Sequence, residues 1–193
     1  MNNYSDFSGD IQKCLEVLKA GGVILYPTDT IWGLGCDATN SSAVSKLLEI
    51  KKRPQDMAMV VLVNSEVMIE SYVKEVPEIA WQIIEVAEEP ITIIYPGAKN
   101  LATNVIAKDG SIAIRLCKDN FCSQLISKYR KPLVSTSANF SGENSPTVFS
   151  EISSELLKKV DYVVCYRQND NSVNKPSSII KLGIGSEIVI IRE

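Results

Sequence analysis

The sequence predicts an α/β protein in which a twisted mixed sheet carries flanking helices. The chain has 193 residues, 45% of them hydrophobic and 22% charged, as is ordinary for a globular protein. Short runs rich in β-branched residues alternate with stretches whose apolar residues recur every three or four positions. Such alternation is typical of α/β folds. Because the chain is short and has no internal repeat or linker, we expect residues 1–193 to form a single domain.

The helical stretches are defined by their apolar spacing and by capping signals. The clearest is expected at 41–52, where Asn40 or Ser41 provides the cap and Pro54 prevents continuation. Residues 77–88 begin with a proline, which is favoured in the first turn of a helix. The other expected helices are 10–20, 121–129 and 151–158.

The strands are expected where β-branched and aromatic residues gather in short runs. The first covers 23–26 and ends at Pro27, which cannot continue a strand ladder. The others are expected at 59–63, 91–95, 112–116, 133–135, 162–166, 178–182 and 188–191.

The chain contains no histidine. This absence excludes Ser-His-Asp and Cys-His catalysis, HExxH zinc sites and imidazole acid–base chemistry. Any catalysis must therefore use lysine, arginine, carboxylate, hydroxyl or backbone groups, or a borrowed metal. The net charge of −3 argues against a nucleic-acid binder whose affinity rests on bulk charge. Residues 66–89 hold seven Glu and one Lys, which leaves the rest of the chain mildly basic.

Cysteine usage and the N-terminus indicate the compartment. Five cysteines without a CxxC pair predict neither a disulfide set nor a zinc ribbon, and most are expected to be buried thiols. The polar N-terminus lacks a signal-peptide pattern, and no apolar run approaches the roughly 20 residues of a membrane span. We therefore expect a cytoplasmic protein with no membrane partner and no metal held by the protein itself.

One predicted helix carries a lysine where an apolar residue is expected. Lys51 follows Val44 by seven residues, at the centre of the apolar face of the helix at 41–52. A lysine there needs an anionic partner or water, and Lys52 and Arg53 add further cations at the helix end. The same cations could simply offset the helix dipole, and Lys51 could extend to solvent. An anion site and a structural role both stay open.

A second unusual segment spans residues 132–142, where a β-rich run breaks into small hydroxyl and amide side chains. Ser137, Asn139 and the backbone N–H groups could donate hydrogen bonds to a phosphate. The same side chains could equally form a polar turn that caps the next segment. The residues alone do not separate these two interpretations.

Three motifs, in sequence order, carry a resemblance to a known family. They are GVILYPTDTIWGLGCDA at 22–38, IKKRP at 50–54 and STSANFSG at 135–142. With them the chain resembles the YrdC family of L-threonylcarbamoyl-AMP synthases, and the likeness extends from Gly22 to Arg192. The resemblance implies a YrdC-like fold with a concave groove. It also implies an enzyme, a nucleotidyltransferase, that takes part in making the threonylcarbamoyladenosine of tRNA.

The resemblance also implies roles for individual residues. The family's KxR and SxN set falls on Lys51, Arg53, Ser137 and Asn139, with Lys51 and Arg53 as the catalytic pair. These four bind the nucleotide together with the closing arginine, Arg192. The implied substrate-binding residues are Thr28, Thr30, Trp32, Arg115 and Ser177, and Arg115 meets either a carboxylate or a phosphate. Residues 87–92 depart from the family pattern, because they read AEEPIT in place of WPGPLT.

The implied reaction brings ATP, L-threonine and bicarbonate into one groove. The threonine amine and bicarbonate form an N-carboxy species, whose oxygen attacks the α-phosphorus of ATP and releases pyrophosphate. This chemistry needs positioning and charge stabilisation more than a protein nucleophile, which suits a chain without histidine. Mg²⁺ is expected on the ATP phosphates. A tRNA contact and downstream tRNA threonylcarbamoyl-transfer proteins are the other expected partners.

Two alternatives to the synthase stay open. The chain could be a YrdC-like protein that binds double-stranded RNA or tRNA across a basic face. Residues available for such a face are Lys51, Lys52, Arg53, Lys128, Arg130 and Lys131. It could also belong to a sister branch whose enzyme uses another amine substrate.

Overall fold

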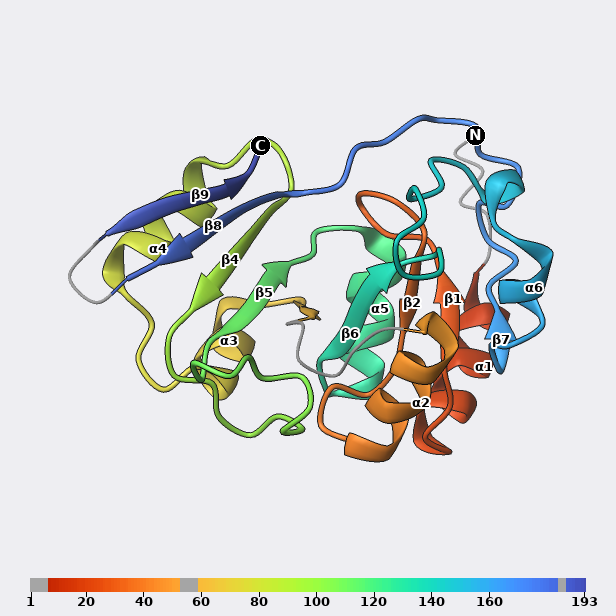
Figure 1. Cartoon of the computed structure of the whole chain (residues 1–193), viewed down its shortest axis with the longest axis horizontal. Helices are drawn as coiled ribbons and strands as arrows, with labels where there is room; N and C mark the ends of the chain where they lie inside the picture. Colours follow the sequence, from red (N-terminus) through yellow and green to blue (C-terminus); the bar gives the residue numbers. More distant parts are fainter. Residues whose placement is uncertain (1–6, 53–58, 184–186) are drawn as a thin grey trace.

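The computed structural model describes residues 7–52, 59–183 and 187–193. Within these residues, nine strands form one mixed sheet in the order β7-β1-β2-β6-β3-β5-β4-β8-β9 (Figure 1). Parallel pairing joins β1 to β7, β3 to β5 and β4 to β8, and the other neighbours are antiparallel. The strands are β1 (Ile24–Tyr26), β2 (Gly33–Gly35), β3 (Val60–Val63), β4 (Ile91–Tyr95), β5 (Ile112–Leu116), β6 (Leu133–Ser137), β7 (Tyr162–Val163), β8 (Ser178–Leu182) and β9 (Ile188–Arg192). The predicted α/β class with a mixed sheet is therefore confirmed.

The helices flank this sheet, and α1 packs against α5. They are α1 (Ser8–Lys19), α2 (Ser41–Lys51), α3 (Glu66–Tyr72), α4 (Glu78–Val86), α5 (Asn120–Tyr129) and α6 (Ser154–Leu157), with a 3₁₀ turn at Phe149–Glu151. Asn40 caps α2 as predicted, because its Oδ1 accepts hydrogen bonds from the backbone N–H groups of Ser42 and Ala43. No helix among the described residues is long and apolar enough to cross a membrane.

The sequence prediction missed β2 and α3. The two glycines of β2 give it a weak strand signal, yet the packing requires them. A Cβ on Gly35 would lie 2.5 Å from Cε1 of Tyr26 and 2.7 Å from the carbonyl oxygen of Val134. Glycine at this position therefore allows β2 to lie between β1 and β6.

Two predicted elements are shorter than expected. The strand predicted at 162–166 ends at Val163, because the N–H groups of Cys165 and Tyr166 donate to the Asp10 carboxylate of α1, each at 2.9 Å. The helix predicted at 151–158 begins at residue 154. The Ser153 side chain caps it by accepting a hydrogen bond from the Glu155 N–H at 3.3 Å.

Asp37 is a buried carboxylate just beyond the end of β2, and it connects the end of α5 with the loops beside it. It is 2% exposed, and it accepts hydrogen bonds from Thr39, from the Tyr129 hydroxyl at 2.7 Å and from Lys131 Nζ at 2.7 Å. Burial raises the pKa of Asp37, but these hydrogen bonds outweigh burial and hold the pKa below its ordinary value.

The thiols fit the prediction that most cysteines are buried, since Cys165 is exposed and Cys14, Cys36, Cys117 and Cys122 are buried. The segment 164–177 links β7 near one edge of the sheet to β8 near the other. In Figure 1 it crosses the top of the molecule. It carries Pro176 and Ser177 to the neighbourhood of β9, where they reach the site described next.

Candidate active site

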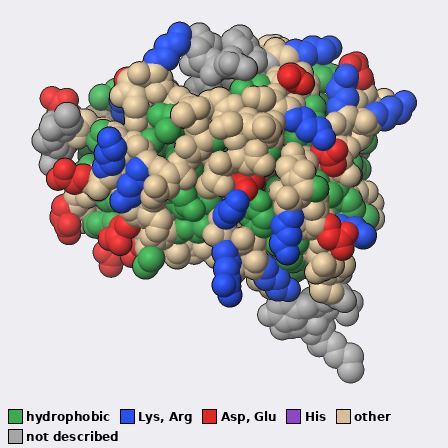
Figure 2. Space-filling model, turned by 90° about the horizontal axis from the view of Figure 1, so that it is seen from below, with side chains coloured by type: hydrophobic (Ala, Val, Ile, Leu, Met, Phe, Trp, Pro, Cys, Tyr) green, Lys and Arg blue, Asp and Glu red, His purple; other side chains and the backbone are tan. Residues whose placement is uncertain are grey.

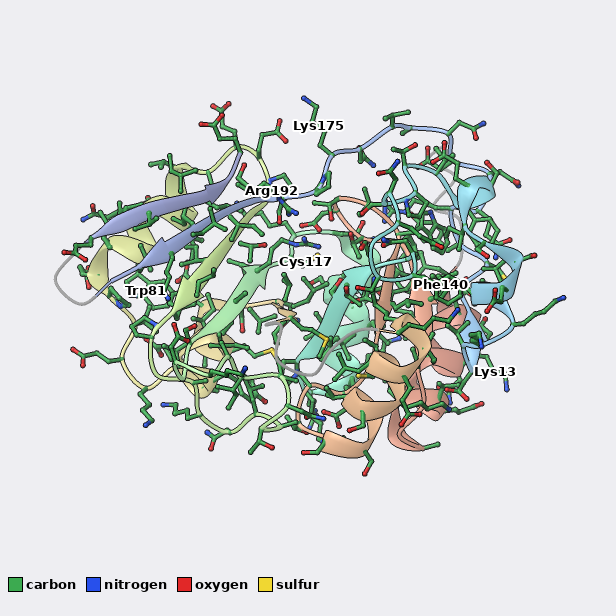
Figure 3. The ribbon with its side chains drawn as sticks, in the orientation of Figure 1. Lys13, Trp81, Cys117, Phe140, Lys175 and Arg192 are labelled. Carbon is green, nitrogen blue, oxygen red and sulfur yellow. The ribbon has the colours of Figure 1, made fainter. Side chains whose placement is uncertain are left out.

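A pocket with about 770 Å³ of empty space, its open mouth included, lies on one face of the sheet where β2, β6, β3 and β5 lie side by side. Strand register explains its lining. Val60 pairs with Ser135, and Gly33 pairs with Ser137, so these residues point to the same face. Arg115 reaches the pocket from β5, and Arg192 reaches it from the end of β9. Figure 3 shows Arg192 beneath the crossing segment 164–177.

Arg115 is almost completely buried, with its side chain 7% exposed. Its Nη2 lies 3.0 Å from Oδ1 of Asp29 and donates to the Thr28 hydroxyl at 3.4 Å. Its Nε is buried and has no hydrogen-bond partner among the described residues. A buried guanidinium with an unused donor is suited to bind a carboxylate or a phosphate.

Arg192 is the second guanidinium of the pocket. Its Nε and Nη2 donate to the carbonyl oxygen of Ser177 at 3.1 Å and 2.6 Å. Burial and the neighbouring positive charge of Arg115 lower the pKa of Arg192 from its ordinary value. The two positive charges repel each other, so an anion bound between them would stabilise both.

Hydrogen-bonded hydroxyl groups form the pocket wall around the two arginines. Thr28 is 3% exposed; its hydroxyl donates to the carbonyl oxygen of Ile31 at 2.8 Å and lies 3.0 Å from the hydroxyl of Thr30. Ser177, also 3% exposed, shares a 2.7 Å hydrogen bond with Thr92. Thr28 and Ser177 therefore fix the surroundings of Arg115 and Arg192.

Lys51 lies behind this wall and is 2% exposed. Its Nζ donates to the carbonyl oxygen of Ser137 at 2.6 Å and to Oδ1 of Asn139 at 3.4 Å. Asn139 in turn donates to the carbonyl oxygen of Glu143 at 2.7 Å. The ammonium of α2 thus fixes the end of β6 and the turn that follows it.

The structure brings most of the predicted site residues together. Those that line the pocket are Thr30, Trp32, Arg115, Ser137, Ser177 and Arg192. Thr28 joins them through Arg115, and Lys51 and Asn139 join them through Ser137. Arg53 lies outside the described residues.

The sequence places the PTDT motif of residues 27–30 at the site, but it did not single out Asp29 as a site residue. Its carboxylate is the counter-charge of Arg115, which is 86 positions away in the chain. The signal that could have found it is an acid between two threonines expected to bind substrate. Ser135 and Ser145, which also line the pocket, were not predicted either.

The lining does not fit a metal ion held by the protein. Among the described residues, no group of three or more His, Cys, Asp or Glu could hold one. The pocket offers hydroxyl and guanidinium groups, which suit an anion.

Comparison with known sequences identifies the chain's relatives. The family model Sua5_yciO_yrdC, described as "Telomere recombination", matches residues 16–193. A threonylcarbamoyl-AMP synthase of Pseudoalteromonas translucida is 33% identical over 172 residues, which are 88% of this chain and 91% of that protein. One of Vibrio cholerae is 31% identical over 158 residues, which are 80% of this chain and 84% of that protein.

Comparison with solved structures agrees. P. abyssi Sua5 complexed with L-threonine matches with a TM-score of 0.82 and 25% identity, over 95% of this chain. The match covers 54% of the Sua5 chain, so this chain spans about half of that protein. E. coli YciO has a TM-score of 0.82 at 24% identity, covers 96% of this chain and 89% of its own, and shows the shared fold. The chain therefore belongs to the Sua5/YciO/YrdC family.

Proposed function

We propose that this chain is a threonylcarbamoyl-AMP synthase and that its pocket brings L-threonine, bicarbonate and ATP together. The observation that carries the proposal is the pair of guanidinium groups, Arg115 and Arg192, in one pocket with a hydroxyl-lined wall. All three substrates carry a carboxylate, carbonate or phosphate group. The relatives named above bear this activity in their names, and the P. abyssi relative is described as a complex with L-threonine.

The reaction has two balanced steps. The threonine amine attacks the carbon of bicarbonate, and loss of water leaves an N-carboxylate. An oxygen of that carboxylate attacks the α-phosphorus of ATP, a new O–P bond forms, and pyrophosphate leaves with the electron pair of the broken bond. Charge develops on phosphate oxygens during the second step, so fixed cations in a largely buried pocket lower its barrier.

Each part of the site has a role in this proposal. Arg115 binds the threonine carboxylate, because it lines the pocket beside Thr28 and Thr30, whose hydroxyls suit a small polar substrate. Arg192 holds phosphate oxygens from the opposite wall. Ser137 donates to the nucleotide, and the charge of Lys51, behind it, stabilises the same anion.

The experiment that tests the function measures pyrophosphate release from Mg-ATP with threonine and bicarbonate omitted in turn. We expect release only when both are present, and we expect Lys51→Ala and Arg53→Ala to abolish it while the protein stays folded. Lys13→Ala is the matched control, because the Lys13 side chain is 60% exposed on α1. Wild-type rates in both site variants would contradict the proposal.

The pyrophosphate assay and an RNA-binding measurement separate the two alternative functions. Release with another amino acid in place of threonine would indicate the sister-branch enzyme. Filter binding of double-stranded RNA or tRNA at several salt concentrations would reveal an RNA-binding protein, since phosphate contacts give a steep salt dependence. We expect weak RNA binding, because the net charge of the chain is −3. Figure 2 shows acidic as well as basic side chains on the face that it draws. We expect downstream tRNA threonylcarbamoyl-transfer proteins to consume the adenylate.

A further inference from the structure

A second pocket lies on the other face of the sheet from Arg115. Side chains alternate along a strand, so Arg115 of β5 points to the first pocket while Ile114 and Leu116 point away from it. The end of α4 and residues 87–90 close this second pocket, which holds about 590 Å³ of empty space including its open mouth. We call it the α4 pocket.

The walls and the mouth of the α4 pocket differ in chemistry. The walls are apolar and include Ile84, Ile93 and Ile114. The mouth carries the carboxylates of Asp29, Glu88 and Glu89 and one ammonium, that of Lys118. Apolar walls beneath an acidic mouth favour a ligand with an apolar body and a positive charge.

Asp29 adds an independent observation. It lines the α4 pocket, and its Oδ1 pairs with Arg115 Nη2 at 3.0 Å. This contact lacks the alignment of a hydrogen bond, so the buried Oδ1 accepts none from the described residues. A buried carboxylate oxygen with unused acceptor capacity is costly unless a donor reaches it. The Asp29 side chain is 15% exposed, so an ammonium in the α4 pocket can approach the carboxylate while Oδ1 stays beside Arg115.

We propose that the α4 pocket binds a small molecule with an apolar body and a single ammonium group, and that the ammonium pairs with Asp29. The apolar body lies against the isoleucines of β4 and β5. The ammonium lies at the mouth, where the carboxylates outnumber Lys118. The ligand and the substrates of the first pocket thus contact opposite sides of one ion pair.

The shared ion pair couples the two pockets. An ammonium beside Asp29 neutralises part of the carboxylate charge that otherwise compensates the positive charge of Arg115. Arg115 then binds an anion in the first pocket more strongly. Stronger anion binding at Arg115 tightens threonine binding, and so lowers its KM, if Arg115 binds the threonine carboxylate. This part of the inference rests on the proposed function.

Binding is tested without any activity measurement. Phenethylamine, 2-phenylethanol and phenylacetate share one apolar body and carry a positive, a neutral and a negative group, and each is titrated into the full chain by calorimetry. We expect one phenethylamine per chain, bound about tenfold more tightly than 2-phenylethanol, and no binding of phenylacetate. Asp29→Asn should remove the preference for the amine. Phenylacetate binding as tightly as the amine would overturn the proposal.

Filling the pocket provides the second test. Ala87 lines the α4 pocket, so Ala87→Trp should abolish phenethylamine binding, and Ala87→Leu should weaken it if the larger variant fails to fold. Val67→Trp is the matched control, because Val67 is 71% exposed on α3. Unchanged binding in a folded Ala87→Trp variant would overturn the location.

The coupling between the two pockets is tested by measuring the KM for threonine with and without the amine. Phenethylamine should lower the KM for threonine about fivefold, at the lower end of typical coupling. A raised KM would show competition at the threonine site and overturn the proposal, and an unchanged KM with binding intact would overturn the coupling. Failure of the proposed function is distinguishable, because pyrophosphate release would then be absent without any amine, whatever calorimetry shows.

Discussion

The Arg115–Asp29 pair contributes both to stability and to activity. Variants that replace the two residues separately and together can distinguish these two contributions. The two side chains are 7% and 15% exposed, so Arg115→Met leaves a carboxylate in a poorly solvated place. Removing one partner of a buried pair destabilises a protein by about 3–5 kcal/mol. Adding Asp29→Asn removes the stranded charge, so we expect the double variant to return to within about 1–2 kcal/mol of the wild type.

Activity should follow a different pattern. Asp29→Asn keeps the Arg115 cation, whereas both variants that lack Arg115 lose a donor to the anion. Losing such a group costs about 2–4 kcal/mol in the transition state, which is roughly 30- to 1,000-fold in rate. We therefore expect Arg115→Met and the double variant to be equally inactive even though their stabilities differ.

The assay combines urea unfolding with threonine-dependent pyrophosphate release on the same four proteins. Lys181→Met is the matched control, because the Lys181–Asp109 pair is exposed, at 42% and 53%, and should contribute at most about 1 kcal/mol. Wild-type activity in the double variant would refute the role of Arg115. A double variant no more stable than Arg115→Met would refute the argument from burial.

Two further predictions concern the fold. Hydrogen bonds hold the pKa of Asp37 below its unfolded value near 3.9, so its contribution to stability is present above about pH 4 and is lost as pH falls through the folded-state pKa. Asp37→Asn should therefore cost about 1–3 kcal/mol at pH 7 and flatten the pH dependence of urea unfolding below about pH 5; an unchanged slope in that range would contradict this. Gly35→Ala should lower the stability by about 2 kcal/mol or more, because its Cβ would lie 2.5 Å from Cε1 of Tyr26. Gly9→Ala is the control, since a Cβ at Gly9 in α1 meets nothing within 4 Å. This substitution should stabilise the helix by about 0.5–1 kcal/mol. Equal melting temperatures for Gly35→Ala and Gly9→Ala would argue against the close approach at Gly35.

The elements that sequence predicted well are those whose signals are local. The helix at 41–52 has its cap, its apolar face and its terminating residues within one stretch, and the structure forms α2 there. The elements missed or mismeasured depend on distant partners. The strand β2 needs glycine at position 35 because Tyr26 and Val134 approach it closely. The strand at 162–166 is cut short by Asp10.

The site shows the same division. Sequence singled out Lys51 because a lysine on an apolar helix face needs a partner, but it could not show that the partners named here are Ser137 and Asn139. It placed Arg115 on a strand without revealing that Asp29 is its counter-charge. Both facts depend on contacts between residues 86 or more positions apart, which no local pattern records.

The central claim is that one pocket joins threonine, bicarbonate and ATP, and the most direct test is to identify the product. The protein is incubated with Mg-ATP, L-threonine and ¹³C-labelled bicarbonate, and the nucleotides are analysed by mass spectrometry. We predict threonylcarbamoyl-AMP that carries one ¹³C atom, formed in equal amount with pyrophosphate and absent from the Arg115→Met variant. Pyrophosphate released without a labelled adenylate, or an adenylate formed without threonine, would contradict the account.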